Sequence, residues 1–171
     1  MTERPNAFNF YGPRALSGPE LKPGDHAPDA ALTNSKFETV RITDFAGKPL
    51  VISVVPSLDT GVCTRQTLRF NQEAAAIGTQ AAFLTISADL PFAQARWCGV
   101  NNVANMYTFS DHRTMAFGAA YGTLVDDLRI ESRAVFVVDS QGVVRYAEYV
   151  PTAGQEPNYE AVLDALRTTL G

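Results

Sequence analysis

The chain has 171 residues, of which 46% are hydrophobic and 19% charged, and its formal net charge is −4. This length suits a single domain, residues 1–171, which can bury roughly two thirds of its unfolded surface, and the composition excludes a mainly disordered chain. Two cysteines are too few for a domain held together by disulfides. The slight acidity argues against a nucleic-acid-binding protein, which needs a concentrated positive field.

Targeting and membrane-spanning segments are not expected. The first 18 residues contain no apolar stretch long enough for the core of a signal peptide. The apolar runs elsewhere stay far below the ~20 residues that span a bilayer. We therefore expect a soluble, cytoplasmic protein without a membrane partner, in which any pairing of the two cysteines is transient and chemical.

Strands and helices alternate along the chain after a proline- and glycine-rich start at residues 1–28. The expected elements are strands at 36–42 and 50–55, a helix at 61–77 ended by Gly78, a strand at 81–87, a short helix at 91–98, an extended stretch at 103–109, a short helix at 114–121, strands at 133–139 and 143–149 joined by a turn, and a helix at 158–170. This order predicts an α/β, thioredoxin-like fold with a mixed central sheet flanked by helices. Residues 1–24 would form an extended or hairpin extension.

The most informative segment joins the second expected strand to the long helix and places Cys63 in the first helical turn. Asp59 or Thr60 is expected to cap this helix, because each offers a side-chain oxygen to free backbone N–H groups. A helix N-terminus favours a thiolate over a thiol. Cys63 shares a helical stripe with Phe70 and Ala74, so it should face the sheet at the bottom of a pocket. From spacing alone, a small apolar core residue is an equally good interpretation.

The residues around Cys63 separate these interpretations. Pro56, Thr60 and Cys63 form the pattern PxxxTxxC, which matches the active-site motif of the peroxiredoxins. The longer string PSLDTGVC resembles the thiol peroxidase branch, the atypical two-cysteine peroxiredoxins. Further similar strings follow in order: RFN at 69–71, ISADLPFAQ at 86–94, SDHR at 110–113, RAVFVVD at 133–139, EYV at 148–150 and EPNYEA at 156–161.

The resemblance implies a role for each matching residue. Cys63 corresponds to the peroxidatic cysteine, whose thiolate attacks the outer oxygen of a peroxide and becomes a sulfenic acid. Arg133 and Thr60 correspond to the groups that activate the thiolate and bind the peroxide, and Pro56 to a wall that shapes and dries the loop. Cys98 corresponds to the resolving cysteine, which attacks the sulfenic acid and forms an intramolecular disulfide with Cys63.

Each of these residues also has a purely structural interpretation. Thr60 can be only a helix cap, Pro56 only a strand terminator, Arg133 only a solvated strand end and Cys98 only an incidental buried thiol. The RAVFVVD string favours Arg133 over the other arginines for the activating role. The rival arginines are Arg65, Arg69 and Arg129.

Formation of the disulfide is expected to require movement. A disulfide needs Cα atoms about 4.4–6.8 Å apart, and cysteines on separate helices need not meet this condition. We expect the first turn around Cys63 and the segment 97–99 to rearrange, helped by Gly61 and Gly99. Two stretches depart from the family pattern: the sequence after Cys98 lacks an acidic residue, and Thr152 replaces another one. Both departures bear on movement of the resolving segment or docking of the reductant.

These observations predict a thiol-dependent peroxidase acting on hydrogen peroxide and alkyl hydroperoxides, with a pocket lined by apolar residues near Pro56, Leu58 and Val62. The resemblance further implies thioredoxin as the reductant and a homodimer. No cofactor or metal is expected, because two cysteines and two histidines at irregular spacing make no metal site and no phosphate-binding loop is present. A non-enzymatic redox sensor and an inert fold relative are the alternatives.

Overall fold

A computed structural model describes residues 1–171 and contains a seven-stranded mixed sheet in the order β11-β10-β5-β6-β7-β3-β4. Its strands are β3 (Ala31–Thr33), β4 (Thr39–Arg41), β5 (Leu50–Val54), β6 (Ala82–Ser87), β7 (Tyr107–Ser110), β10 (Arg133–Val138) and β11 (Val144–Val150). β5, β6 and β7 are parallel, whereas β10 pairs antiparallel with both β5 and β11. The central strands are buried along their whole length, and most of their residues are apolar. The predicted α/β fold with a mixed sheet is confirmed.

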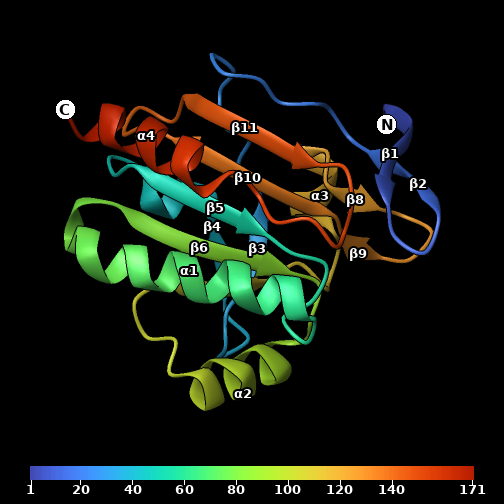
Figure 1. Cartoon of the computed structure of the whole chain (residues 1–171), viewed down its shortest axis with the longest axis horizontal. Coiled ribbons are helices and arrows are strands. Elements are labelled where there is room, and N and C mark those ends of the chain that lie inside the picture. The colour runs from blue at the N-terminus through green and yellow to red at the C-terminus, as the bar shows by residue number, and fades with distance from the viewer.

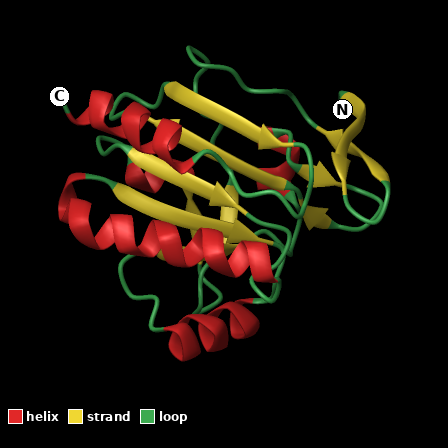
Figure 2. Ribbon diagram, in the orientation of Figure 1, coloured by secondary structure: helices red, strands yellow, loops and turns green.

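Helices cover both faces of this sheet (Figures 1 and 2). They are α1 (Gly61–Ile77), α2 (Pro91–Asn101), α3 (Ala116–Tyr121) and α4 (Tyr159–Leu170). α1 and α4 lie in front of the sheet in Figure 1 and pack on side chains such as Val51 and Val135. α3 packs on the opposite face, where Phe117 joins Ile52 in a second cluster. Successive residues of β5 therefore enter different clusters, as the alternation of side chains along a strand requires.

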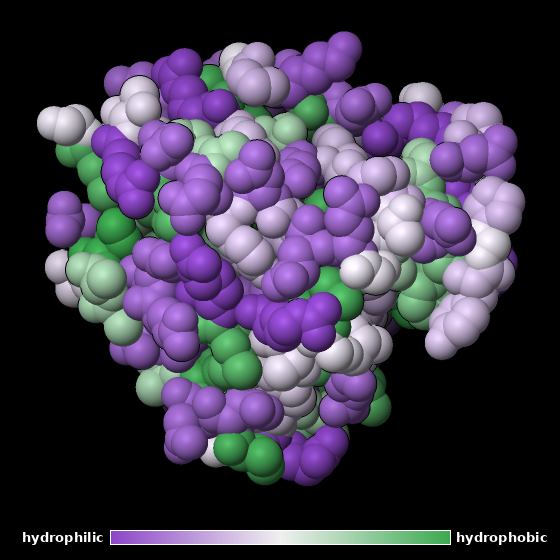
Figure 3. All heavy atoms as spheres, viewed as in Figure 1, coloured by the Kyte–Doolittle hydropathy of each residue, from purple (hydrophilic) through white to green (hydrophobic).

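The N-terminal segment forms the predicted hairpin from β1 (Glu3–Asn9) and β2 (Pro13–Ser17). The hairpin belongs to a second, four-stranded sheet that also contains β8 (Leu124–Val125) and β9 (Ile130–Glu131). This sheet was not expected, because two-residue strands carry no periodic signal. Figures 1 and 3 show the hairpin as a lobe beside the main body.

The largest differences between the expected and the observed boundaries lie at three elements. The strand expected at 36–42 ends at Arg41, where the Asp44 carboxylate accepts a hydrogen bond from the Arg41 N–H and turns the chain into a 3-10 helix (Ile42–Phe45). α2 is longer than expected and ends where Asn102 adopts a left-handed conformation. The stretch expected from residue 103 becomes a strand only at Tyr107.

α2 is attached to the body along a narrow face. Its buried residues are Pro91, Gln94 and Trp97, whereas Phe92 and Val100 are each 72% exposed. In Figure 3 the surface is largely hydrophilic, with apolar side chains visible at the lower end, over α2. None of the helices has the length and apolar character needed to cross a membrane.

Two carboxyl groups, Asp111 and Glu131, are buried next to each other. Asp111 accepts hydrogen bonds from the backbone N–H groups of Phe117 at 3.1 Å and Gly118 at 2.9 Å. Glu131 accepts one from the Thr123 hydroxyl at 2.5 Å. Burial and the adjacent Asp111 raise the pKa of Glu131 well above its usual value. Glu131 is therefore the partner of this pair that holds a proton.

This pair predicts a stability that falls with increasing pH. The pKa of Glu131 is higher in the folded than in the unfolded protein. Its contribution to the free energy of unfolding is therefore fully present below the unfolded-state pKa, and it is lost as the pH rises through the folded-state pKa. Glu131→Gln cannot ionise and places a neutral amide beside Asp111, so we expect its free energy of unfolding at pH 8 to exceed the parent's. Urea unfolding between pH 5 and 8 measures this difference, which should shrink towards pH 5. Parallel curves for the two proteins would contradict the assignment.

Candidate active site

Cys63 lies in the first turn of α1, directly after the loop that leaves β5. Thr60, with an extended backbone, is the residue that precedes the helix. The Cys63 side chain is fully buried and packs with Leu58 and Trp97. Phe70, on the same helical stripe, is buried as well, as expected. The helix therefore holds the sulfur on its inner side, near its positive end.

Arg133 is the positively charged group next to this sulfur. It begins β10, is only 1% exposed, and its Nη2 lies 3.2 Å from Cys63 Sγ. The other guanidinium hydrogen bonds go to Gln66 Oε1 at 2.8 Å and to the Ala153 carbonyl at 2.7 and 3.1 Å. Gln66 is itself fixed by a 2.8 Å hydrogen bond to Ser53 Oγ. These contacts hold the guanidinium where it stabilises a thiolate and retains a fixed orientation.

The rival arginines have other partners. Their closest polar contacts are Glu156 for Arg65 at 3.6 Å, Glu73 and Glu160 for Arg69 at 3.0 and 3.2 Å, and the His112 carbonyl for Arg129 at 3.4 Å. Only Arg133, among the four candidates, contacts Cys63.

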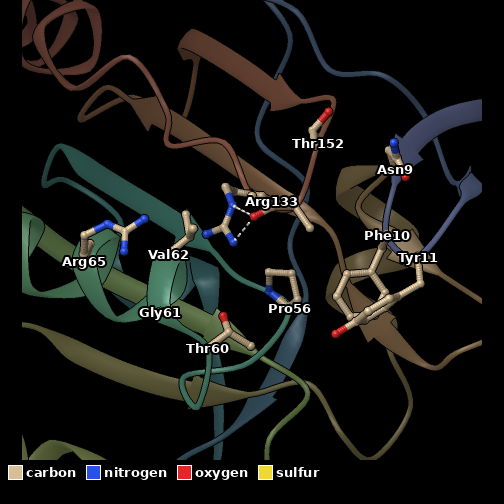
Figure 4. Close-up of a pocket in the computed structure, with 12 residues that line it drawn as sticks. Asn9, Phe10, Tyr11, Pro56, Thr60, Gly61, Val62, Arg65, Arg133 and Thr152 are labelled. Atoms are coloured by element: carbon tan, nitrogen blue, oxygen red, sulfur yellow. Dashed lines mark hydrogen bonds between the residues drawn. The ribbon is translucent and has the colours of Figure 1, made fainter.

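A pocket of about 480 Å³ opens beside the Cys63–Arg133 pair (Figure 4). It is lined by Asn9, Phe10, Tyr11, Pro56, Thr60, Gly61, Val62, Arg65, Arg133, Thr152, Ala153 and Gly154. In Figure 4, Phe10 and Tyr11 of the hairpin turn face Val62 and Arg65 across the pocket, with Arg133 between the two sides. Cys63 does not line the pocket, so a molecule bound there meets the guanidinium first.

Leu58 does not line the pocket, and that expectation is wrong. Its side chain is 2% exposed and packs against Cys63 instead. The pocket's apolar lining comes partly from Phe10 and Tyr11, which belong to the N-terminal hairpin. Pro56, in contrast, is buried and lines the pocket.

Thr60 stands at the N-cap position of α1, but neither it nor Asp59 caps the helix through its side chain. The Thr60 hydroxyl donates to the Ser57 carbonyl at 3.3 Å and makes no hydrogen bond to Cys63. The neighbouring Thr64 hydroxyl fixes the loop instead, by donating to the Leu58 carbonyl at 3.0 Å. The Thr60 side chain lines the pocket, within the space where a ligand would bind (Figure 4).

Cys98 lies in the last turns of α2 and is half-buried. Its sulfur is 3.3 Å from Thr108 Oγ1, and it lines a different pocket together with Met106. Burial raises the pKa of the Cys98 thiol, while the Thr108 hydrogen bond partly offsets the effect. Both cysteines are free thiols, and Cys98 packs at the edge of the cluster that contains Cys63.

Three parts of this site were not predicted from the sequence. Gln66 lies three residues after Cys63 on the same helix face, so its position could have suggested a role beside Arg133. The Ala153 carbonyl is a backbone group and has no sequence signature. The hairpin turn reaches the pocket only through long-range pairing, such as Ser17 with Leu124.

Comparisons with known proteins agree with the geometry. Residues 22–163 match the family model described as Redoxin. A thiol peroxidase of Bacillus subtilis (strain 168) is 51% identical over 156 residues, 91% of this chain and 93% of that protein. A thiol peroxidase of Halalkalibacterium halodurans is 45% identical over 166 residues, 96% of this chain and 99% of that protein. The crystal structure of a peroxiredoxin-like protein from Aquifex aeolicus superposes with a TM-score of 0.85 at 37% identity, covering 92% of this chain and 93% of that chain.

The fold and family model place the chain in the redoxin class, which confirms the expected thioredoxin-like fold. Within that class the chain belongs to the thiol peroxidase family. The protein is accordingly an enzyme, a thiol-dependent peroxidase, as the PSLDTGVC string and its companions predicted.

Replacement of Arg133 tests the contact with Cys63. A lysine carries the same charge but cannot reach the sulfur, Gln66 and the Ala153 carbonyl together. We expect Arg133→Lys to slow alkylation of Cys63 by iodoacetamide at pH 7 about tenfold, the factor for one lost hydrogen bond to a charged group. Arg69→Lys, which changes a partly exposed arginine of α1, is the control and should react like the parent. Equal rates in all three proteins would show that the guanidinium does not activate the thiol.

Proposed function

We propose that Cys63 is the peroxidatic cysteine of this thiol peroxidase and Cys98 its resolving cysteine. Arg133 and Thr60 would activate the thiolate and position the peroxide, and Pro56 would form the dry wall beside them. The observation that carries this proposal is the 3.2 Å contact between Arg133 Nη2 and Cys63 Sγ, at the edge of a pocket that Arg133 itself lines.

The first step is a two-electron oxidation of sulfur. The Cys63 thiolate attacks the outer oxygen of the hydroperoxide, the O–O bond breaks, and Cys63 becomes a sulfenic acid while the alkoxide takes up a proton and leaves as alcohol or water. Negative charge moves from sulfur to the departing oxygen. Fixed donors on the Arg133 guanidinium stabilise this charge without reorganisation, and the Thr60 hydroxyl can turn from Ser57 to the peroxide.

The second step forms a disulfide. The Cys98 sulfur attacks the Cys63 sulfenic sulfur, and hydroxide leaves with the Cys98 proton as water. Because burial raises the pKa of Cys98, this thiol stays protonated in its resting site. The two cysteines are free and line no common pocket, so the movement of both segments expected from the sequence stays part of the proposal.

Hydrogen peroxide and alkyl hydroperoxides are the proposed substrates. The pocket volume of about 480 Å³ exceeds what hydrogen peroxide needs. Phe10, Tyr11, Val62 and Pro56 supply apolar surface for an alkyl chain, and Arg133 supplies the polar donors at one point. This arrangement favours a hydroperoxide with its peroxide group at Arg133 and its chain towards the hairpin.

We further propose thioredoxin as the reductant that returns the disulfide to two thiols, with a cytoplasmic location that supplies it. A homodimer is proposed from the resemblance to the family alone. We also propose that residues 1–171 act as one domain, with residues 1–24 as its extension, because the hairpin packs through Phe8 and Leu16 against Val125 and contributes to the pocket.

A coupled assay with thioredoxin, its reductase and NADPH tests the assignment. The parent should turn over many times, Cys63→Ser should consume no peroxide, and Cys98→Ser should consume about one equivalent and then stop. Many turnovers by Cys63→Ser would remove the peroxidatic assignment, and parental turnover by Cys98→Ser would remove the resolving one. A single turnover by the parent would instead indicate a redox sensor or another reductant, which a second dithiol donor such as dithiothreitol distinguishes.

A further inference from the structure

The carboxylate of Asp89 stands between the two segments that carry the cysteines. Asp89 follows β6 and lies two residues before Pro91, the first residue of α2. Both of its side-chain oxygens are used: Oδ1 accepts a hydrogen bond from Ser57 Oγ at 2.7 Å, and Oδ2 accepts from the Leu58 N–H at 2.8 Å and from Ser87 Oγ at 2.7 Å. One half-buried carboxylate therefore joins the end of β6 to the loop before α1.

On the loop side, Asp89 binds Leu58, and Leu58 in turn packs against Cys63. Ser57 and Leu58 belong to the segment between β5 and α1. Leu58 is held at both ends, because its N–H donates to Asp89 and its carbonyl accepts from Thr64 Oγ1 at 3.0 Å. Its side chain packs against Cys63. The position of the sulfur opposite the guanidinium thus depends on a backbone that Asp89 fixes.

The contacts on the other side reach into α2. Ser87 Oγ, which donates to Asp89, accepts a 3.0 Å hydrogen bond from Gln94 Nε2, and Gln94 is one of the few buried residues of α2. The Asp89 carbonyl accepts a 2.5 Å hydrogen bond from Ser110 Oγ. The first turns of the helix that carries Cys98 are therefore tied to the same carboxylate.

We propose that Asp89 is a positioning residue that couples the two cysteine-bearing segments. Its hydrogen bonds hold the loop in the arrangement in which Cys63 faces Arg133, and their release lets the first turn of α1 and α2 move together towards the disulfide. Asp89 does not line the pocket and does not touch the reacting atoms. The inference rests on the proposed function, because it requires a Cys63–Cys98 disulfide.

Asp89→Asn tests the coupling. Asparagine keeps the size of the side chain but replaces one acceptor oxygen with a donor and removes the charge that strengthens all three hydrogen bonds. We expect the rate constant for oxidation of Cys63 by hydrogen peroxide to fall about tenfold, because fewer molecules hold the loop in the reactive arrangement. Disulfide formation from the sulfenic acid should become severalfold faster. Rapid quenching with a thiol-blocking reagent and mass spectrometry measure both rates.

A second readout is over-oxidation of Cys63. A second peroxide converts the sulfenic acid to a sulfinic acid in competition with Cys98. Faster disulfide formation in Asp89→Asn should therefore lower the yield of sulfinic acid at high peroxide. A residue with a merely structural role would not slow the oxidation of Cys63 and at the same time speed the formation of the disulfide.

Two further variants complete the experiment. Ser57→Ala removes only the hydroxyl that donates to Asp89 from the loop. It should also slow the oxidation of Cys63 and speed disulfide formation, each by a smaller factor than Asp89→Asn. This variant keeps the test valid even if Asp89→Asn folds poorly. Asp126→Asn removes an exposed carboxylate and should behave as the parent. The coupling would be overturned if Cys63 oxidation and disulfide formation both became slower, or if both rates stayed parental in Asp89→Asn and Ser57→Ala. The proposed function would remain intact in that case, provided that the parent protein cycles normally. A parent that forms no Cys63–Cys98 disulfide would overturn both.

Discussion

The contact between the Arg133 guanidinium and the Cys63 sulfur is the interaction on which the site depends. Both side chains are almost fully buried, and a buried charge is costly unless other groups compensate it. Gln66 and the Ala153 carbonyl accept hydrogen bonds from the guanidinium, but neither of them carries a charge, and the Cys63 sulfur lies beside it. The fold has therefore placed a buried cation at a point where negative charge on the sulfur would compensate it.

The pairing of the central strands brings these groups to one edge of the sheet. β5 and β6 are parallel, so the loops that lead to Cys63 and Cys98 leave at the same edge. β10 is antiparallel to β5, with Ala134 opposite Val54, so its first residue, Arg133, lies at that edge as well. Three segments far apart in sequence therefore meet at this edge because of the directions of their strands. Asp89 lies where two of these segments lead into α1 and α2.

The sequence predicted the parts of the fold that are locally patterned. β5 and α1 were found almost to the residue, because an apolar run and a helical stripe ended by Gly78 are strong local signals. The hairpin side of the pocket was missed, because it depends on the pairing of β2 with the two-residue strand β8, more than a hundred residues away. The assignment of Leu58 to the pocket failed for a related reason. An apolar residue next to an active-site motif can face the ligand or the core, and only packing against Cys63 decides between them.

The charge distribution of the pocket differs from that of the whole chain. The chain has a formal net charge of −4, yet the residues that line the pocket include two arginines and no carboxylate. Thr152, where the family pattern has an acidic residue, is one of these lining residues and lies next to Ala153. A carboxylate at this position would compete with the thiolate for the guanidinium. The neutral threonine adds no such charge, which agrees with the proposed role of Arg133 beside Cys63 and the oxygen that would gain charge when the O–O bond breaks.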